Sequence, residues 1–284
     1  MFSILIPTFN NFDYLNITIK SLKKNSELNS HEILLHINDG SDGTLEYAKK
    51  NQIRYTHSKN NVGLCTSINT VSKLAKNDLI LYSHDDMYFC PNWDKILIDE
   101  LNQINHLNFY LSATMIEPHK SAHIQFDCGD NFKNFDEDKF LKNYEKLKFY
   151  DHQGSHFAPH LIHKNLWLKV KGFSEEFNPG MGSDPDFNMK LWNENVRIFK
   201  GINQFRVYHF SSITTRKRGL TKNRGEVTFL KKWYITTKFF KKHYLKSNTK
   251  YEKPLSEPNK NIIYYFDKFI CFFRRIFVIF LYKN

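Results

Sequence analysis

The sequence lacks the motifs and segments that would assign it at once to several common classes. Its cysteines lie far apart with no CxxC pair, so neither a disulfide framework nor a zinc site is indicated, and a reducing compartment fits. Neither G-x-G-x-x-G nor G-x-x-x-x-G-K-S/T occurs, and a dinucleotide or P-loop site is therefore not supported. Residues 1–7 carry no basic region and no long apolar run, which predicts a strand rather than a signal peptide. These absences predict a cytoplasmic protein.

Charge is distributed unevenly along a chain of otherwise ordinary globular composition. The 284 residues are 41% hydrophobic and 25% charged, and the formal net charge is +12. Residues 216–284 hold 18 Lys or Arg against four acidic residues, a net charge of +14, which leaves −2 for residues 1–215. An asymmetry of this size predicts an anionic partner for the C-terminal segment, either nucleic acid or an anionic membrane surface.

Strands and helices alternate in the first half of the sequence. Strands are predicted at 2–6, 32–37, 53–57, 79–83 and 108–114, and the one at 79–83 is a short apolar run preceded by turn-forming residues. Helical periodicity with capping residues predicts helices that begin near residues 13, 44, 64 and 91. Strands that alternate with helices at this spacing predict an α/β fold with a doubly wound, mostly parallel sheet. Residues 117–160 have little pattern and predict no definite element.

Two adjacent carboxylates, Asp85 and Asp86, follow the predicted strand at 79–83. The carboxyl ends of parallel strands meet at one edge of a sheet, so residues 8–11, 38–44, 60–63 and 84–86 should converge there. Such an edge can hold a nucleotide through an acid, backbone amides at helix starts and a divalent cation on the phosphates. The alternative interpretation is a helix cap followed by a solvated acid.

Two later segments add candidates. A loop rich in glycine, residues 172–186, opens a helix, and Asp184 and Asp186 flank its start. Acids in a first helical turn also complement the helix dipole, without any catalytic role. His209 lies near the end of a strand predicted at 205–210. It is either a metal ligand close to Asp86 or a surface or core residue whose ring nitrogens have hydrogen-bond partners within the protein.

In this order, these segments resemble the family 2 glycosyltransferases of the GT-A fold over about residues 1–215. The matching pieces are Ile6-Pro7-Thr8-Phe9-Asn10, the loop 38–44 with Asp39, Asn61-x-Gly63 with Asn69, Asp85-Asp86, Gly172-Phe173-Ser174-Glu175, Asp184-x-Asp186 and His209.

The resemblance implies a role for each matched position. Pro7, Thr8, Asn10, Asp39, Asn61, Gly63 and Asp85 would line the nucleotide-sugar site. Asp86 and His209 would hold Mn²⁺ or Mg²⁺, and Asp184 would be the catalytic base. Trp93, Gly182 and Asp186 would lie on the acceptor side. Ser183 stands where the family usually has Glu, a departure that concerns the acceptor-side contacts.

The predicted function is a metal-dependent, inverting glycosyltransferase that uses a nucleotide-sugar donor, with a UDP-sugar expected. Residues 1–90 would form the nucleotide half and residues 91–215 the acceptor half of the catalytic domain. Two alternatives stay open: a sugar-phosphate nucleotidyltransferase, which should have a Gly-rich basic loop after the first strand, and a non-catalytic binder of membrane or nucleic acid. The first alternative lacks its loop, and the second leaves the converging acids unexplained.

The segment 216–284 predicts a mobile basic loop followed by amphipathic helices. Arg216 is expected to contact the donor diphosphate when the loop at 211–224 closes. Residues 226–247 and 262–282 mix aromatic and basic residues, but their uninterrupted apolar stretches are shorter than the roughly 20 residues of a spanning helix. We expect them to lie on the inner face of the membrane, and the acceptor is then expected to be a lipid or lipid-linked saccharide of cell-envelope glycan or glycolipid synthesis. The alternative is packing on the catalytic domain or in a homodimer. No nucleic-acid-reading motif accompanies the charge.

Overall fold

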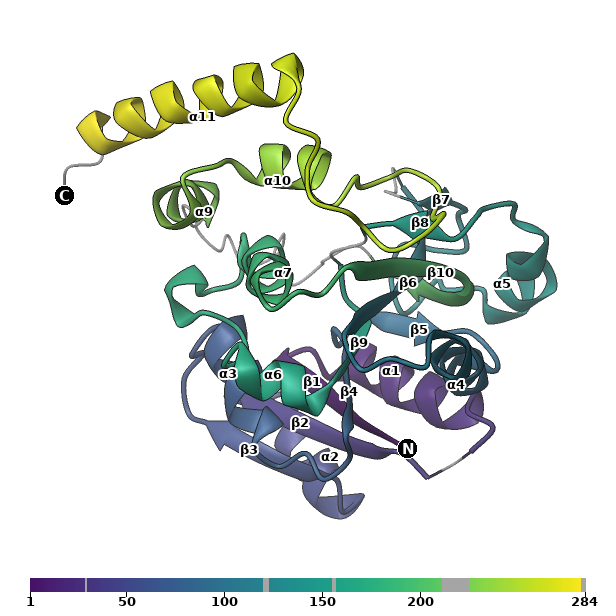
Figure 1. Cartoon of the computed structure of the whole chain (residues 1–284). Coiled ribbons are helices and arrows are strands. Elements are labelled where there is room, and N and C mark those ends of the chain that lie inside the picture. Colours follow the sequence, from purple (N-terminus) through teal and green to yellow (C-terminus); the bar gives the residue numbers. More distant parts are fainter. Residues whose placement is uncertain (29, 120–122, 155–156, 211–224, 282–284) are drawn as a thin grey trace.

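The computed structural model describes residues 1–28, 30–119, 123–154, 157–210 and 225–281 (Figure 1). One mixed sheet runs through these residues in the strand order β3-β2-β1-β4-β9-β6-β10-β5, and β7 and β8 pair with β6 and β10 at its margin. Helices cover the sheet, and the C-terminal helices form a separate layer over α7 (Figure 1). The predicted α/β class is confirmed, with one large sheet flanked by helices.

The first half of the chain follows the predicted alternation. The strands β1 (Phe2–Phe9), β2 (Glu32–Asn38), β3 (Arg54–Ser58) and β4 (Leu79–Tyr82) are parallel. The helices between them are α1 (Phe12–Lys24), α2 (Thr44–Lys50) and α3 (Leu64–Ser72). Pro7 does not end the first strand as predicted. The pairing of β1 with β4 stops at Leu5, whose carbonyl accepts from the N–H of Ser83. Pro7 lies beyond this point on the β4 side of β1, so its missing N–H removes no hydrogen bond from the sheet.

The second half departs from an all-parallel sheet. It contains β5 (Met87–Phe89), α4 (Trp93–Ile104), β6 (Phe109–Glu117), β9 (His160–His163), α6 (Lys164–Lys169), the short helix η2 (Glu175–Phe177), α7 (Ser183–Asn193) and β10 (Ile198–His209). The strand β9 lies between β4 and β6 and is antiparallel to both, and β5 is antiparallel to β10. These antiparallel strands were not predicted. They extend the sheet so that β10 brings His209 beside Met87, next to the acids that follow β4.

The region without sequence pattern forms a small second core. It contains β7 (Ile124–Gln125), α5 (Glu137–Asn143), η1 (Tyr144–Lys146) and β8 (His152–Gln153). Its buried residues are largely aromatic, with Phe140, Tyr208 and Phe210 among them. Aromatic rings bury a large area per residue, so a cluster of this kind can order a segment that has few regular elements.

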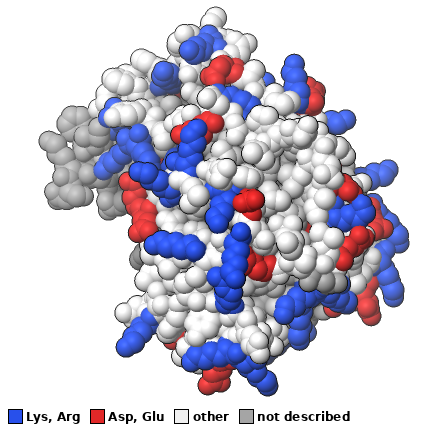
Figure 2. Space-filling model, turned by 60° about the horizontal axis from the view of Figure 1, so that its bottom comes forward, with Lys and Arg blue, Asp and Glu red and all other residues white. Residues whose placement is uncertain are grey.

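The C-terminal segment forms α9 (Gly225–Trp233), α10 (Thr237–His243) and α11 (Ile262–Leu281). Phe229 and Phe240 belong to the main hydrophobic core, so α9 and α10 pack on the domain, as the alternative interpretation allowed. They lie between α7 and α11 (Figure 1). Among the described residues, no helix is both long and apolar enough to cross a membrane. On the face in Figure 2, basic side chains lie among acidic ones and form no continuous basic patch.

Candidate active site

The loops that follow β1 and β2 converge at one edge of the sheet, as predicted. Asn10 donates from Nδ2 to Oδ2 of Asp39 over 2.8 Å, and its Oδ1 accepts from the backbone N–H of Gly40 over 2.8 Å. Asn38 donates to the Thr8 carbonyl and accepts from the N–H of Val62. These bonds tie the loops at 8–11, 38–44 and 60–63 into one surface.

Gly63 connects this surface to the second half of the chain. Its φ is +84°, and a Cβ at this position would overlap the side-chain amide of Asn178. The same Asn178 accepts from the N–H of Cys65 over 2.9 Å, and Asn61 accepts from the N–H of Gly63 over 2.9 Å. Only glycine allows this approach, which fixes the start of α3 against the loop at 172–182.

A candidate metal centre lies where β4 and β10 end. The ligand atoms of His84, Asp86 and His209 all lie within 4.8 Å of one another. His209 Nε2 is 3.4 Å from Asp86 Oδ1, and its Nδ1 is 2.8 Å from Glu117 Oε1. A carboxylate on the far nitrogen orients an imidazole toward a metal, so Glu117 would act as the support for His209. This donor set, two imidazoles and one carboxylate, fits a divalent ion.

Neither His84 nor Glu117 was among the predicted site residues. The position of His84 carried a signal, because it belongs to the segment 84–86 that was predicted to converge at this edge of the sheet. Glu117 carried no such signal, since only the pairing of β6 with β10 brings it to His209.

Burial and charge set the protonation of this cluster. Burial lowers the pKa of His84 to about 4, with Asp86 opposing the shift, so this imidazole is neutral and able to ligate at neutral pH. Burial also lowers the pKa of His209, but Asp86 and Glu117 outweigh it and raise the value to about 10. Burial and the charge of Asp86 raise the pKa of Asp85 to about 7, while Thr8 and Asn11 oppose this shift.

Asp184 has the properties of a general base. It lies in the first turn of α7, and its Oδ1 is buried with no hydrogen-bond partner among the described residues. Burial raises its pKa to about 7, and the ammonium of Lys241 on α10 opposes this shift. Tyr82 is close to the metal cluster, since its ring centroid is 5.6 Å from that of His84. Burial raises the pKa of its hydroxyl, and the charges of Asp184 and Asp85 contribute to this rise.

Asp186 does not face an acceptor, in contrast to the prediction. It is fully buried, and its two oxygens accept from Ser174 over 2.6 Å and from the indole N–H of Trp233 over 2.8 Å. Lys232 lies 2.9 Å from the same carboxylate and also donates to Ser174. These bonds go to protein groups, so Asp186 anchors α9 to the first turn of α7, two residues after Asp184.

Two other residues predicted to lie at the site, Trp93 and Gly182, have structural contacts instead, and a third, Arg216, is not described. Trp93 is 1% exposed, its indole donates to Leu22, and its ring packs on Phe2 at the end of β1 opposite Thr8, so it does not reach the site. Gly182 is the N-cap residue of α7, with a φ of +83°, and it packs against the backbone of Gly225. It therefore contacts the start of α9. Arg216 and the loop at 211–224 lie outside the described residues.

Comparison with known sequences decides the family. Residues 3–160 match the family described as glycosyl transferase family 2. The chain belongs to this family. The resemblance expected from the sequence is therefore confirmed. The matched residues include the convergent loops and the acids after β4, whereas His209 lies outside them.

This chain matches only part of the length of each similar protein. The chain is 26% identical over 236 residues to the chondroitin synthase of Pasteurella multocida (strain Pm70), which covers 73% of this chain and 24% of that protein. The fold is similar to that of S. aureus TarS 1–349 (TM-score 0.55, 16% identity, 73% of this chain and 60% of that one). It is also similar to GalNAc-T7 solved with UDP, GalNAc and Mn²⁺ (TM-score 0.56, 15% identity, 74% and 43%). The chain thus spans about a quarter of the chondroitin synthase.

Proposed function

We propose that the protein is a metal-dependent, inverting glycosyltransferase that moves a sugar from a nucleotide-sugar donor to an acceptor hydroxyl. The observation that carries this proposal is the candidate metal centre of His84, Asp86 and His209 together with Asp184, whose Oδ1 is buried without a partner among the described residues and whose pKa is raised. A transfer with inversion needs these two parts: charge compensation for the leaving diphosphate and a base for the acceptor hydroxyl.

Each residue has a defined task in this proposal. Asp39 and Asp85 bind the nucleoside, and His84, Asp86 and His209 would hold a divalent ion, Mn²⁺ or Mg²⁺, that compensates the diphosphate charge. Asp184 takes the proton of the acceptor hydroxyl. The new bond joins the acceptor oxygen to the anomeric carbon as the bond from that carbon to the phosphate oxygen breaks, so the configuration inverts and the nucleoside diphosphate leaves. No covalent intermediate with the protein is needed.

The donor is proposed to be a UDP-sugar. TarS 1–349 has been solved in complex with UDP-GlcNAc, and GalNAc-T7 with UDP and Mn²⁺. Both share the fold at low identity, so they support the class of nucleotide and not the identity of the sugar.

The acceptor is proposed to be a lipid or a lipid-linked saccharide at the inner face of a membrane. One side of α11 exposes apolar residues at helical spacing: Ile262, Tyr265, Phe266, Phe269, Phe272, Phe273 and Phe277. Lys268, Arg274 and Arg275 lie on the same helix, while its one acid, Asp267, pairs with Lys242 and His243. Aromatic rings with nearby cations favour the interface of an anionic bilayer, where each cation adds about 1 kcal/mol of binding free energy.

A donor panel tests the chemistry. The protein is incubated with UDP-, GDP- and dTDP-sugars and Mn²⁺, and released nucleoside diphosphate is measured with and without a lipid extract. We expect slow hydrolysis of the UDP-sugar alone and faster release with the extract. Absence of turnover with every donor, with and without extract, would refute the enzyme assignment.

Vesicle co-sedimentation tests the membrane surface separately. Phe266, Phe269 and Phe273 are exposed by 51–62%, so their replacement by Ser removes apolar area from the surface of α11 and little from the core. Leu168→Ser, at a leucine 61% exposed on α6, is the matched control. We expect the triple variant to lose binding to anionic vesicles and the control to retain it. Equal sedimentation of both would contradict a membrane-facing α11.

A further inference from the structure

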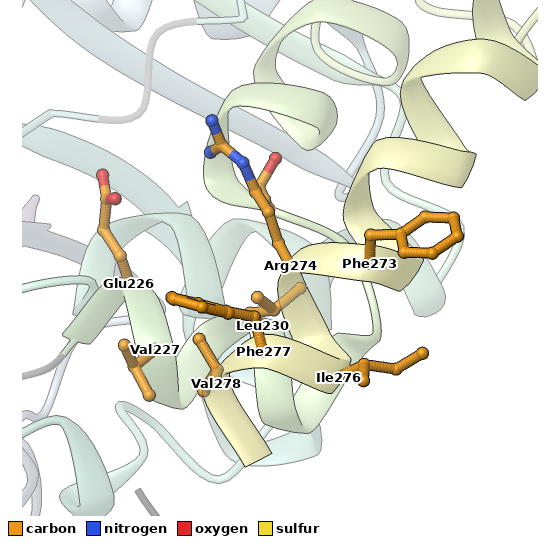
Figure 3. Close-up of a pocket in the computed structure, with 9 residues that line it drawn as sticks. Glu226, Val227, Leu230, Phe273, Arg274, Ile276, Phe277 and Val278 are labelled. Carbon is orange, nitrogen blue, oxygen red and sulfur yellow. The ribbon is translucent and has the colours of Figure 1, made fainter. Parts of the chain in front are cut away.

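A groove of about 560 Å³ separates α9 from α11 (Figure 3). Its lining residues are Glu226, Val227, Leu230, Thr236, Phe273, Arg274, Ile276, Phe277 and Val278. Its volume is within the range of small-molecule binding sites, about 300–1,000 Å³. Neither the donor site nor the metal centre uses any of these residues.

The groove has an apolar interior and a charged rim. Figure 3 shows the ring of Phe277 lying across the space between the helices, with Leu230 and Val278 close to it. The charged ends of Glu226 and Arg274 both rise on the same side of the groove. Arg274 is exposed and lines the groove, so its guanidinium can meet an anionic group there.

One end of the groove approaches the loop that precedes α7. Gly225, the first residue of α9, packs so closely on the loop before α7 that a Cβ there would overlap the carbonyl of Met181. The charges of Glu226 and Asp184 both act on the ammonium of Lys241, opposing the lowering of its pKa by burial. The start of α9, where the groove begins, is therefore next to the first turn of α7.

The opposite side of the groove joins the exposed face of α11. Phe273 and Phe277 line the groove and are also 51% and 64% exposed. An apolar path thus runs from the surface of α11 to the start of α9. A second copy of this chain would need to insert side chains between two helices, whereas a single hydrocarbon chain can enter from the surface of α11.

We propose that this groove binds the hydrocarbon chain of a lipid acceptor, with the acceptor's phosphate at Arg274 and its sugar end directed toward Asp184. The proposal rests on the glycosyltransferase function above and specifies how its acceptor is held. It requires that affinity rise with chain length, by about fourfold for each buried methylene.

Binding of n-alkyl phosphates tests the groove without any turnover. Hexyl, octyl and decyl phosphate are titrated below their micelle concentrations by calorimetry, with the full chain. We expect affinity to rise from hexyl to decyl by about 16-fold if two of the four added methylenes are buried, and by about 250-fold if all four are. Val227 is half-buried at the groove, so Val227→Trp should reduce decyl phosphate affinity at least tenfold, and Leu168→Trp is the control for an added indole elsewhere.

A second variant separates the rim from the interior. Arg274→Met should weaken decyl phosphate but leave the neutral decyl glucoside unchanged. Phe277→Ser should weaken both ligands, and the thermal midpoint of each variant shows whether it folds. Equal affinity for all chain lengths, or unchanged affinity in Val227→Trp and Phe277→Ser, would overturn the proposal. Loss of a dimer in Val227→Trp would also overturn it, because a second copy would then occupy the groove.

Affinity for UDP and Mn²⁺, measured on the same variants, keeps this test apart from that of the function. If UDP binding and donor hydrolysis persist while alkyl phosphates do not bind, the groove proposal fails and the glycosyltransferase proposal stands. If UDP binding is absent in the unmodified protein, the proposed function fails by itself.

Discussion

Replacing Asp184 with Asn should stabilise the protein at alkaline pH and abolish sugar transfer. Burial raises the pKa of this carboxyl to about 7, against 3.8 for an ordinary aspartate. Because the folded-state pKa is the higher one, the associated stability is present below about pH 4 and is lost as the pH rises to about 7. Asn carries no charge and does not undergo this loss.

The size of the effect follows from the pKa difference. One pKa unit corresponds to about 1.4 kcal/mol, which gives an upper limit of about 4 kcal/mol. The side chain is half-buried and not fully enclosed, so we halve this and expect about 2 kcal/mol. The free energy of unfolding of Asp184→Asn relative to the unmodified protein should therefore rise by about 2 kcal/mol between pH 4 and pH 8.

Urea unfolding at pH 4, 6 and 8 measures this difference, and Asp13→Asn, at an exposed acid on α1, is the control. UDP affinity should be unchanged in Asp184→Asn, while the transfer rate should fall by about 10²- to 10⁴-fold. In the unmodified protein, kcat/KM should rise about tenfold per pH unit up to about pH 7 and then level off. A stability difference that is the same at all three pH values, or transfer at a rate near that of the unmodified protein, would refute the assignment of Asp184 as a buried base.

Three further predictions concern the metal centre and the anchor of α7. Asp86→Ala should lose Mn²⁺-dependent UDP affinity at least tenfold in calorimetry, and unchanged affinity would disprove its role as a ligand. Glu117→Gln should weaken Mn²⁺ binding about 10- to 100-fold while UDP affinity without metal stays constant; equal Mn²⁺ binding would mean that Glu117 does not orient His209. Trp233→Phe leaves one oxygen of buried Asp186 with one donor fewer, and should cost about 1–3 kcal/mol in urea unfolding and slow transfer without changing UDP affinity; full stability would contradict the anchor.

The sequence was most informative where local pattern and fold agree. In residues 1–83, β1, β2 and β4 are apolar runs and the helices between the strands have an apolar period, so the four parallel strands and the convergence of their loops could be predicted. The strand β9 could not be predicted in this way. It is only four residues long, and its position between β4 and β6 depends on pairings with residues about 50 to 80 positions away.

The candidate site shows the same limit. Asp184 and Asp186 stand in the same first turn, and their sequence context does not distinguish them. The distinction comes from α9, whose Trp233 and Lys232 saturate the carboxylate of Asp186, while the Oδ1 of Asp184 has no partner among the described residues. Of two similar acids, the one with unsatisfied oxygen is the one available to a substrate.

The basic C-terminal segment shows that a net charge predicts an external partner only for those cations that are not already paired within the protein. The net charge of +14 over residues 216–284 predicts an anionic partner, but several of these cations already have one within the protein. Lys232 pairs with Asp186 and Glu176, and Lys242 pairs with Asp267. Their charge is used in holding α9 to α7 and α11 to α10. Arg274 has no such pair among the described residues and stands at the rim of an apolar groove, so it is at this position that the excess charge becomes an argument for a lipid phosphate.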